Sequence, residues 1–441
     1  MGIISDKNKE IALWAKKHAL EQGVDAVRIV LVAGTNNSFE FRDTLLENLE
    51  SSTENSLNIE LFVNRRYGTF STNRLDRDEL ETLIQQGIES VKNLAKDECR
   101  QLPDPQRYYK KGDTVLEICD AGYFDISTDQ KLQIGQKIAE EIYKTHPDII
   151  SIASSYSDSI SSVYINDSNG FEVQTDKTSY SLMVSVSLKT ESDARPEAYW
   201  YDVATHWENL QKEGGGKIAL EKAMQKIGQT KVLSGKYTML LDNMTSTRLL
   251  SPLISALSGS SIQQRSSFLI NKLNKKLFSE KLTLIDKPHQ KKKIGSRLYD
   301  GEGVATRERT IIENGVLKTY FIDTYNSLKL GMEPTIASAS GLCMQLGNKS
   351  HKELLRGITK GIWVTGFNGG NTNPTTGDFS FGIEGFLIED GRVIKPVSEM
   401  NITGNLLTLW AKISEIGNDP RKNISTQIPS IVFDDVNFSG L

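Results

Sequence analysis

DFSFGIEGFLIEDGRVI, running from Asp378 to Ile394, is the stretch that indicates the fold class most directly. Apolar residues alternate with small or polar ones in its first part, which is typical of a strand with one buried face. Asp390-Gly391 accepts positive φ, so a tight turn is expected between this strand and the next. The same apolar-turn-apolar pattern surrounds Asn314-Gly315. Two such hairpins in one half of the chain predict a large antiparallel sheet there.

The first half of the chain mixes helix and strand patterns. Apolar residues recur at helical spacing in the segments 11–19, 80–94 and 132–142, and Asp76 with Glu79 forms a capping signal before the second of them. Strand patterns occupy RIVLVAG with NSFEF (28–41), expected as a pair of strands, IELFVNRRYGTFSTN (59–73), and the serine-rich stretch 150–165, expected as an exposed antiparallel pair. Because no regular βαβ rhythm appears, the sequence predicts an α+β fold: an N-terminal mixed α/β-sheet domain followed by a mostly antiparallel β C-terminal domain.

The domain boundary is expected between residues 228 and 229. A chain of 441 residues is too long for a single ordinary core, and two domains, 1–228 and 229–441, are the simplest division. The triple glycine Gly214–Gly216 opens a helical pattern that ends near Ile227 and could serve as a connector. A phosphate-binding role for these glycines is disfavoured, because no suitable strand precedes them and no GK[ST] follows.

The composition excludes several classes of protein. The formal net charge of -4 disfavours nucleic acid as a partner, and the basic run Lys291–Lys293 is interpreted as a solvated loop. No apolar stretch is long enough to span a membrane and no secretory h-region is present, so we expect a cytoplasmic protein without membrane contact. Cys99, Cys119 and Cys343 are odd in number and widely spaced, which favours buried thiols over a disulfide framework or a metal knuckle.

Familiar catalytic motifs are absent from the sequence. It contains no GxSxG, HExxH, P-loop or GxGxxG, and its five histidines are scattered. His206 and Glu208 have the spacing of a strand and could face one cleft, but two polar residues on an exposed strand is the simpler interpretation. The residues taken alone therefore suggest no catalytic centre.

Three long stretches of the second half resemble the TldD/PmbA family, also described as modulators of DNA gyrase, in which two kinds of subunit form a peptidase. They are DGEGVATRERTIIENGVLKTYFIDTYNSLKLG (300–331), GDFSFGIEGFLIEDGRVIKPVSEMNITGN (377–405) and IGNDPRKN (416–423). A thinner match, RYGTFSTNRLDRDEL (66–80), keeps the same order and spacing in the first half. The resemblance therefore covers nearly the whole chain.

The resemblance also implies where a metal site would lie. The TldD-type subunit carries H-E-x-x-x-H on a helix and a late cysteine, which can hold Zn²⁺ with one coordination position open while the glutamate handles the proton of a zinc-bound water. Aligned without gaps over residues 248–269, this chain has Leu250 and Ser255 at the two histidines and Ser251 at the glutamate. Leucine has no donor atom and a serine hydroxyl is a poor zinc ligand. Pro252 is expected to kink the helix.

The late cysteine is missing as well. The stretch PRKNISTQIPS (420–430), which follows Asp419, contains no thiol. We therefore expect no catalytic residue and no metal ligand in this chain. This pattern matches the PmbA or TldE branch of the family.

Membership of that branch implies a subunit that is inactive alone. Its partner would be a TldD-type paralogous subunit that supplies zinc, and its substrates would be peptides or unfolded small proteins undergoing proteolysis or maturation. In isolation it could form a homodimer. Two alternatives stay open, an independent hydrolase with a non-metal nucleophile in the serine-rich segment 251–267 and a gyrase-modulating binding protein without peptidase activity.

Overall fold

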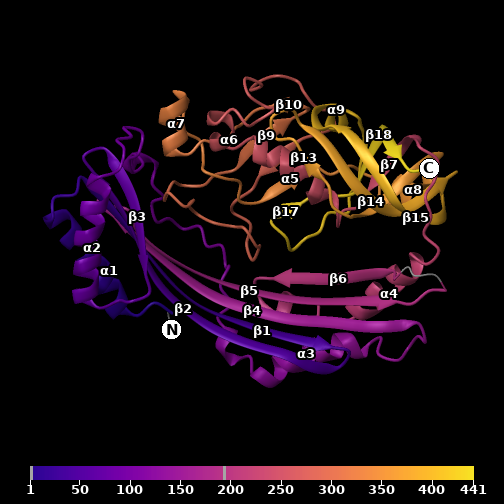
Figure 1. Ribbon diagram of the computed structural model, residues 1–441, viewed down its shortest axis with the longest axis horizontal. Helices are drawn as coiled ribbons and strands as arrows, with labels where there is room; N and C mark the ends of the chain where they lie inside the picture. Colours follow the sequence, from indigo (N-terminus) through magenta and orange to yellow (C-terminus); the bar gives the residue numbers. More distant parts are fainter. Residues whose placement is uncertain (1–2, 192–194) are drawn as a thin grey trace.

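A six-stranded antiparallel sheet organises the first half of the chain (Figure 1). Its strands lie in the order β3-β2-β1-β4-β5-β6. They are β1 (Ala26–Arg42), β2 (Leu45–Val63), β3 (Arg66–Thr72), β4 (Ile149–Asp167), β5 (Glu172–Leu188) and β6 (Glu197–Ala204). The computed structural model describes residues 3–191 and 195–441, and the protein is 23% helix and 39% strand. The predicted α+β fold class is confirmed.

Helices cover one face of this sheet. They are α1 (Asp6–Glu21), α2 (Arg77–Lys92), α3 (Thr128–Glu140) and α4 (Gly215–Gln225). The alternation of β4 explains the one-sided cover, since Ile152, Tyr156 and Ile160 are buried in one core with α3 and α4. Ser155, Ser157 and Ser159 point to the other face and are only partly buried. Ser154 lies on the helix side, where its buried hydroxyl donates to the Gly135 carbonyl of α3 at 2.7 Å. Figure 1 shows that this second face is concave and is turned toward the second half of the chain.

The second half contains two further sheets. One has the order β10-β9-β8-β11-β17, and the other has the order β12-β7-β18-β15-β14-β13 with β16 paired to β18. Because β12 also pairs with β14, five strands of the larger sheet form a closed ring. The strands are β7 (Gly235–Leu241), β8 (Leu284–Asp286), β9 (Arg309–Glu313), β10 (Val316–Leu317), β11 (Leu342–Met344), β12 (Lys360–Phe367), β13 (Asn371–Thr372), β14 (Asp378–Glu389), β15 (Arg392–Asn405), β16 (Ile413–Ile416), β17 (Thr426–Gln427) and β18 (Ile431–Ser439). The helices are α5 (Ser246–Ala256), α6 (Gly259–Gln263), α7 (Thr324–Leu330), α8 (His351–Arg356) and α9 (Leu406–Ala411).

The local sequence signals correspond to observed elements. Both predicted hairpins form, β9 with β10 and β14 with β15, and the turn residues Asn314 and Asp390 have φ of 47° and 46°. The capping signal before α2 is also confirmed, because the Asp76 side chain accepts a hydrogen bond from the Glu79 N–H at 2.9 Å. None of the helices in the described residues is long and apolar enough to cross a membrane.

Two strand predictions were wrong. Residues 28–41 belong to the single strand β1 rather than to a pair, and residues 150–165 belong to the single strand β4, whose partners are β1 and β5. Gly34, the apparent break in β1, allows close contact with β4: a Cβ there would lie 3.0 Å from the carbonyl oxygen of Ile160. Glycine at this position thus serves sheet packing rather than a turn.

A segment without regular strands or helices over most of its length, residues 108–120, connects the two halves and is here named the strap. At its start the Tyr109 N–H donates to the Gly303 carbonyl at 2.9 Å. Near its end the Ile118 carbonyl accepts from Thr178 of β5 at 3.1 Å, and the Leu116 carbonyl accepts from Lys292 at 2.8 Å. The strap therefore contacts both the first sheet and the loops of the second half. The division at residues 228 and 229 stays a prediction.

Candidate functional site

Helix α5 carries the positions at which the resemblance places a metal site. The helix follows β7 and is fixed at its start by Asp242, whose side chain accepts from the Met244 N–H at 2.8 Å and whose carbonyl accepts from the Ser246 N–H at 2.9 Å. Pro252 lies inside the helix, where its ring removes the hydrogen bond that would reach the Arg248 carbonyl. The kink expected at Pro252 stays a prediction.

The three aligned positions of α5 have different environments. Leu250 is 1% exposed and belongs to the apolar core of the second half, together with Leu249 and Leu253. Ser251 and Ser255 are exposed. Residues four apart lie on the same face of a helix, so the two hydroxyls share the outward face while Leu250 points into the core.

Ser251 and Ser255 line a cavity of ≈ 310 Å³ beside β13 and β14. Arg248 also lines it, and its guanidinium lies 5.4 Å from the ring centroid of Phe381 and donates to the Gly370 carbonyl at 3.3 Å. The polar groups that line the cavity are hydroxyls, one amide and this guanidinium. Zinc prefers imidazole, thiolate and carboxylate ligands, and a cationic side chain opposes any metal ion. The side chains of this cavity therefore do not fit Zn²⁺, and no catalytic step is assigned to a metal here.

The late stretch 420–430 lies close to the start of α5, as the resemblance implies for its counterpart. The Asn243 amide donates to the carbonyl of Asp419 at 2.6 Å. Arg421 packs on β6, with its guanidinium 4.0 Å from the Tyr201 ring centroid and a hydrogen bond of 3.2 Å to the Tyr201 carbonyl. Within the described ranges 3–191 and 195–441, no group of three or more His, Cys, Asp or Glu residues is placed to hold a metal ion.

Other residues singled out in the sequence have structural contacts. The interpretation of His206 and Glu208 as strand residues was wrong, because β6 ends at Ala204; Glu208 instead pairs with Lys292 at 3.0 Å. His206 is buried, with its Nδ1 3.0 Å from the Thr205 hydroxyl. In the basic run, Lys291 pairs with Glu117 of the strap at 2.5 Å. The run therefore holds loops together. The three cysteines are free and partly buried.

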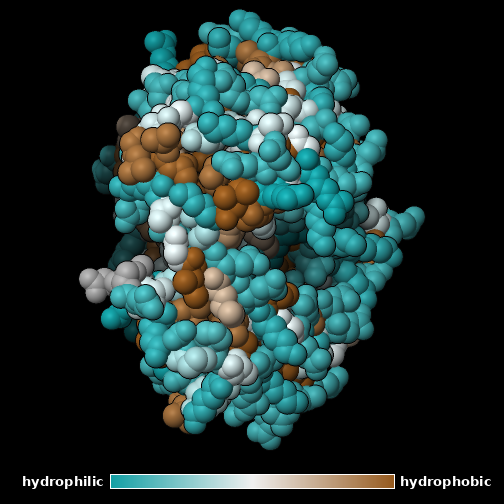
Figure 2. Space-filling model, turned by 90° about the vertical axis from the view of Figure 1, so that its right-hand side faces the viewer, coloured by the Kyte–Doolittle hydropathy of each residue, from teal (hydrophilic) through white to brown (hydrophobic). Residues whose placement is uncertain are grey.

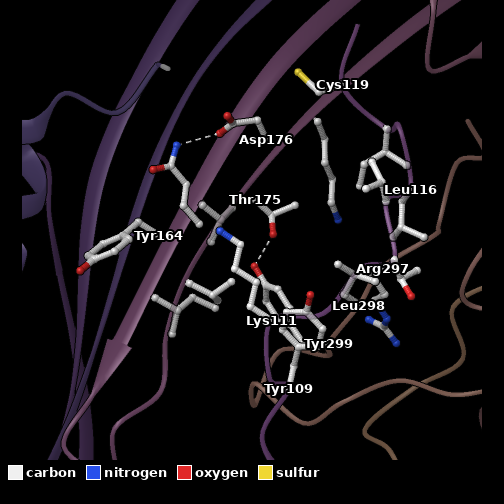
Figure 3. A pocket seen from close by; sticks show the side chains of 18 of the residues that line it. Tyr109, Lys111, Leu116, Cys119, Tyr164, Thr175, Asp176, Arg297, Leu298 and Tyr299 are labelled. Carbon is white, nitrogen blue, oxygen red and sulfur yellow. Dashed lines mark hydrogen bonds between the residues drawn. The ribbon is translucent and has the colours of Figure 1, made fainter. Parts of the chain in front are cut away.

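A larger groove, which the sequence did not reveal, lies where β4 and β5 meet the strap and the loop 297–301 (Figure 3). Its volume is ≈ 990 Å³. At one end Tyr109 stacks on Tyr299 with ring centroids 5.8 Å apart, and the Tyr299 hydroxyl lies 2.5 Å from the Thr175 hydroxyl of β5. Figure 3 shows the strap with Leu116 and Cys119 on the opposite side of the open space from β5.

Charged side chains of both signs surround this groove. Burial lowers the pKa of Lys177 and the nearby Arg297 guanidinium lowers it further, while burial raises the pKa of the Cys119 thiol. Lys177 is nevertheless exposed to solvent, as expected of a side chain that lines an open groove. No local signal could have identified the groove, because residues far apart in the sequence form it. The alternating serines of β4 were a partial sign, since they predict a sheet face that no core covers.

Comparison with known proteins gives the class of this chain. Three family models match successive parts: PmbA/TldA metallopeptidase domain 1 at residues 27–91, the central domain at 123–227 and the C-terminal domain at 234–440. The fold and the order of these domains are those of a metallopeptidase-family protein. The chain belongs to the PmbA/TldD family.

Relatives with similarity along the whole chain agree with this assignment. A Bacteroides thetaiotaomicron protein, provisionally named a modulator of DNA gyrase, has a crystal structure that is 52% identical, covers 99% of this chain and 100% of its own, and has a TM-score of 0.97. The Haemophilus influenzae protein named metalloprotease PmbA homolog is 27% identical over 98% of this chain and 96% of its own length. The crystal structure of TldE from Thermococcus kodakarensis, 20% identical over 98% of this chain and 100% of its own with a TM-score of 0.85, shares the fold.

Proposed function

We propose that this chain is the PmbA or TldE-type subunit of a two-subunit zinc metallopeptidase, with the metal held by a TldD-type paralogous partner. The observation that carries the proposal is the set of residues on α5. Leu250, at the position of the first histidine, is buried in the core, while Ser251 and Ser255 supply hydroxyls where the metal-bearing branch has the glutamate and the second histidine. Membership of a metallopeptidase family supports a role in the proteolysis or maturation of peptides and unfolded small proteins. The nucleophilic water would then belong to the partner.

This chain's own contribution would be to bind and enclose the substrate. Its first sheet is curved, its uncovered face carries small polar side chains, and a groove of ≈ 990 Å³ lies along it. An extended peptide can gain main-chain hydrogen bonds from a free strand edge, which gives affinity that depends little on peptide sequence. Such a surface suits a subunit that presents varied peptides to a catalytic centre on another chain.

An apolar surface supports the expectation of a protein partner. Figure 2 shows apolar side chains gathered on the end of the molecule that carries the C-terminus, over both halves. Elements at this end expose Met224 at 41%, Val393 at 45% and Ile394 at 50%. Contiguous apolar patches on a protein surface often mark sites where another chain binds. In the absence of the partner, the same surface would favour a homodimer. The three free thiols fit the reducing cytoplasm, where we place the complex.

Co-expression with a TldD-type chain that carries H-E-x-x-x-H tests the proposal. We expect zinc and peptidase activity to appear in the purified complex, and neither to appear in this chain alone. A partner with both histidines replaced by alanine is the matched control and should assemble without zinc or activity. Stoichiometric zinc bound by this chain alone would contradict the proposal. Cleavage by this chain that survives a chelator and is abolished by Ser251→Ala would instead support an independent hydrolase, and direct binding to gyrase without any peptidase activity would support the modulator role.

A further inference from the structure

Strand β5 leaves part of its edge unpaired inside the large groove. On one side β5 pairs with β4 along its whole length, from Glu172 to Leu188. On the other side β6 pairs only with residues Tyr180–Ser187. Residues 172–179 therefore form a free sheet edge, and the strap contacts it through the hydrogen bond from the Thr178 N–H to the Ile118 carbonyl. The groove lies along the remainder of this edge.

The direction of the free main-chain groups follows from the Thr178 contact. In a strand, successive residues direct their N–H and C=O groups to opposite sides. Because the Thr178 N–H points away from β4 to reach the strap, the main-chain groups of Asp176 and Gln174 point the same way. Among the residues that the structure describes, neither has a backbone partner on that side. Gln174 and Asp176 therefore offer two unpaired N–H and two unpaired C=O groups to the groove.

The acidic and basic side chains beside this edge differ in whether they already have partners. Each carboxylate of the groove has a donor within the protein: Asp176 accepts from the Gln174 amide at 3.0 Å, Glu172 from the Tyr164 hydroxyl at 2.8 Å, and Glu117 from Lys291 at 2.5 Å. Buried Asp300 accepts from three backbone N–H groups. By contrast, the ammonium groups of Lys177 and Lys111 have neither a hydrogen bond nor an ion pair with any residue that the structure describes. A carboxylate on a ligand could therefore pair with Lys177 without displacing a partner that this lysine already has.

Lys177 occupies the position of a cross-strand partner. It projects on the same face of β5 as Thr175, which contacts Tyr299, and lies opposite Ser161 of β4. A strand added at the free edge would place one of its side chains directly across from Lys177, about 5 Å away between Cβ atoms. Opposite charges at such a pair attract, and like charges repel. An acidic residue is the side chain that this position would favour.

From this geometry we propose that the free edge of β5 at residues 172–177 is a peptide subsite, which binds an extended segment by strand addition and prefers a carboxylate opposite Lys177. This inference rests on the proposed function for its peptide substrate, and adds to it the location, the binding mode and the charge preference. The carboxylate is either an acidic side chain or the C-terminus of the peptide. Tyr109 and Tyr299 bound the aromatic end of the same groove.

The sheet has a second free edge, and its charge opposes the same ligand. β3 pairs only with residues 57–63 of β2, so residues 45–56 are also unpaired on that side. That edge carries Glu47, Glu50 and Glu54 and no basic residue. A carboxylate-bearing peptide would be repelled there. The two edges therefore provide an internal comparison.

Binding to the purified chain, without partner or metal, tests the subsite. The probe is a fluorescein-labelled, C-terminally amidated peptide of about eight residues, the length of a short strand, in which serine and valine alternate around one glutamate. A second probe has glutamine in place of this glutamate, and a third has glutamine with a free C-terminal carboxylate. We expect about tenfold weaker binding of the second probe, because glutamine keeps an acceptor for Lys177 but lacks the charge that strengthens the hydrogen bond. Recovery with the third would identify the terminal carboxylate as an equivalent ligand.

Variants and hydrogen exchange locate the binding site. Lys177→Met should weaken binding of the glutamate peptide about tenfold. The affinity for the glutamine peptide should stay within about twofold of the wild-type value. Lys7→Met, at an exposed lysine of α1, is the matched control and should change neither. Saturating peptide should slow amide exchange in residues 172–177 and leave residues 45–56 unchanged. This measurement on the unaltered chain does not depend on how well any variant folds.

The outcomes separate this inference from the proposed function. Equal binding by wild type and Lys177→Met, protection at 45–56 instead of 172–177, or no saturable binding by the folded chain would overturn the subsite. None of these measurements uses zinc or cleavage. Failure to obtain an active complex on co-expression would refute the proposed function and leave an observed β5 subsite standing. An active complex, combined with no protection at residues 172–177, would support the proposed function and refute the β5 subsite.

Discussion

Replacing Leu250 by alanine should destabilise the second half of the chain by about 3 kcal/mol. The side chain is 1% exposed and belongs to the large apolar core around α5 and the closed ring of strands. Leucine-to-alanine changes at buried positions cost about 2.7–5 kcal/mol, because transfer free energy is lost and a cavity remains. We take about 3 kcal/mol, from the lower part of this range, because α5 is near the surface and the site can partly collapse.

Urea unfolding followed by tryptophan fluorescence measures this change, since Trp410 lies in the same core. The midpoint should fall without a change in the slope, which reports the surface exposed on unfolding. A loss of about 3 kcal/mol also corresponds to roughly 6–12 °C in Tm for a unit of about 200 residues. Ser251→Ala and Ser255→Ala are matched controls on the exposed face and should change stability by less than about 0.5 kcal/mol. A loss below about 1 kcal/mol for Leu250→Ala would refute the assignment of this position to the core.

Three further changes test other parts of the structure. Asp167→Ala should cost about 3–5 kcal/mol in urea unfolding, because it removes the carboxylate that lies 2.9 Å from the buried Arg28 guanidinium and forms an ion pair with it. A loss under about 1 kcal/mol would contradict the buried ion pair. Gly216→Ala should lower Tm measurably, because its Cβ would lie 2.4 Å from the Ile138 carbonyl oxygen, and an unchanged Tm would show that α3 and α4 are not so closely packed. Burial raises the pKa of Glu302 above its ordinary value of 4.5, so the wild type should lose stability relative to Glu302→Gln as pH rises from below 4.5 through the folded-state pKa. Parallel Tm profiles for the two proteins over that pH range would contradict this.

Local chemistry explains which elements could be predicted from the sequence. The Asn314-Gly315 and Asp390-Gly391 turns form as expected, because these residues take positive φ at little cost whatever surrounds them. The Asp76 cap of α2 is equally local. Strand length was predicted less well, since Gly34 looks like a break until its contact with β4 is known. Whether a glycine ends a strand or permits close packing depends on a neighbour more than 120 residues away.

The candidate sites also differ in how far the sequence could predict them. The positions Leu250, Ser251 and Ser255 came from resemblance to a family motif, and their assignment as a degenerate metal site remains a prediction. Their environments could not be foreseen, because α5 packs on strands from distant parts of the second half. The β5 groove was entirely beyond local reasoning: it depends on β6 ending short of residues 172–179, and on a strap and a loop that approach from either side.

The residues on the inward and outward faces of α5 explain how this chain can fold without zinc. A metal site adds its binding free energy to folding, so a domain built around one is weakened when the metal is removed. Here the inward position on α5 is occupied by a buried leucine, whose removal from water stabilises the folded state by roughly 1.5–3 kcal/mol. The exposed hydroxyls of Ser251 and Ser255 need no metal ion for stability, because they can form hydrogen bonds with water. The packing of α5 therefore depends on apolar contacts, and its stability should not respond to a chelator. If functions are divided between two chains as proposed, only the partner's fold would be linked to zinc supply, and this chain would stay folded without it.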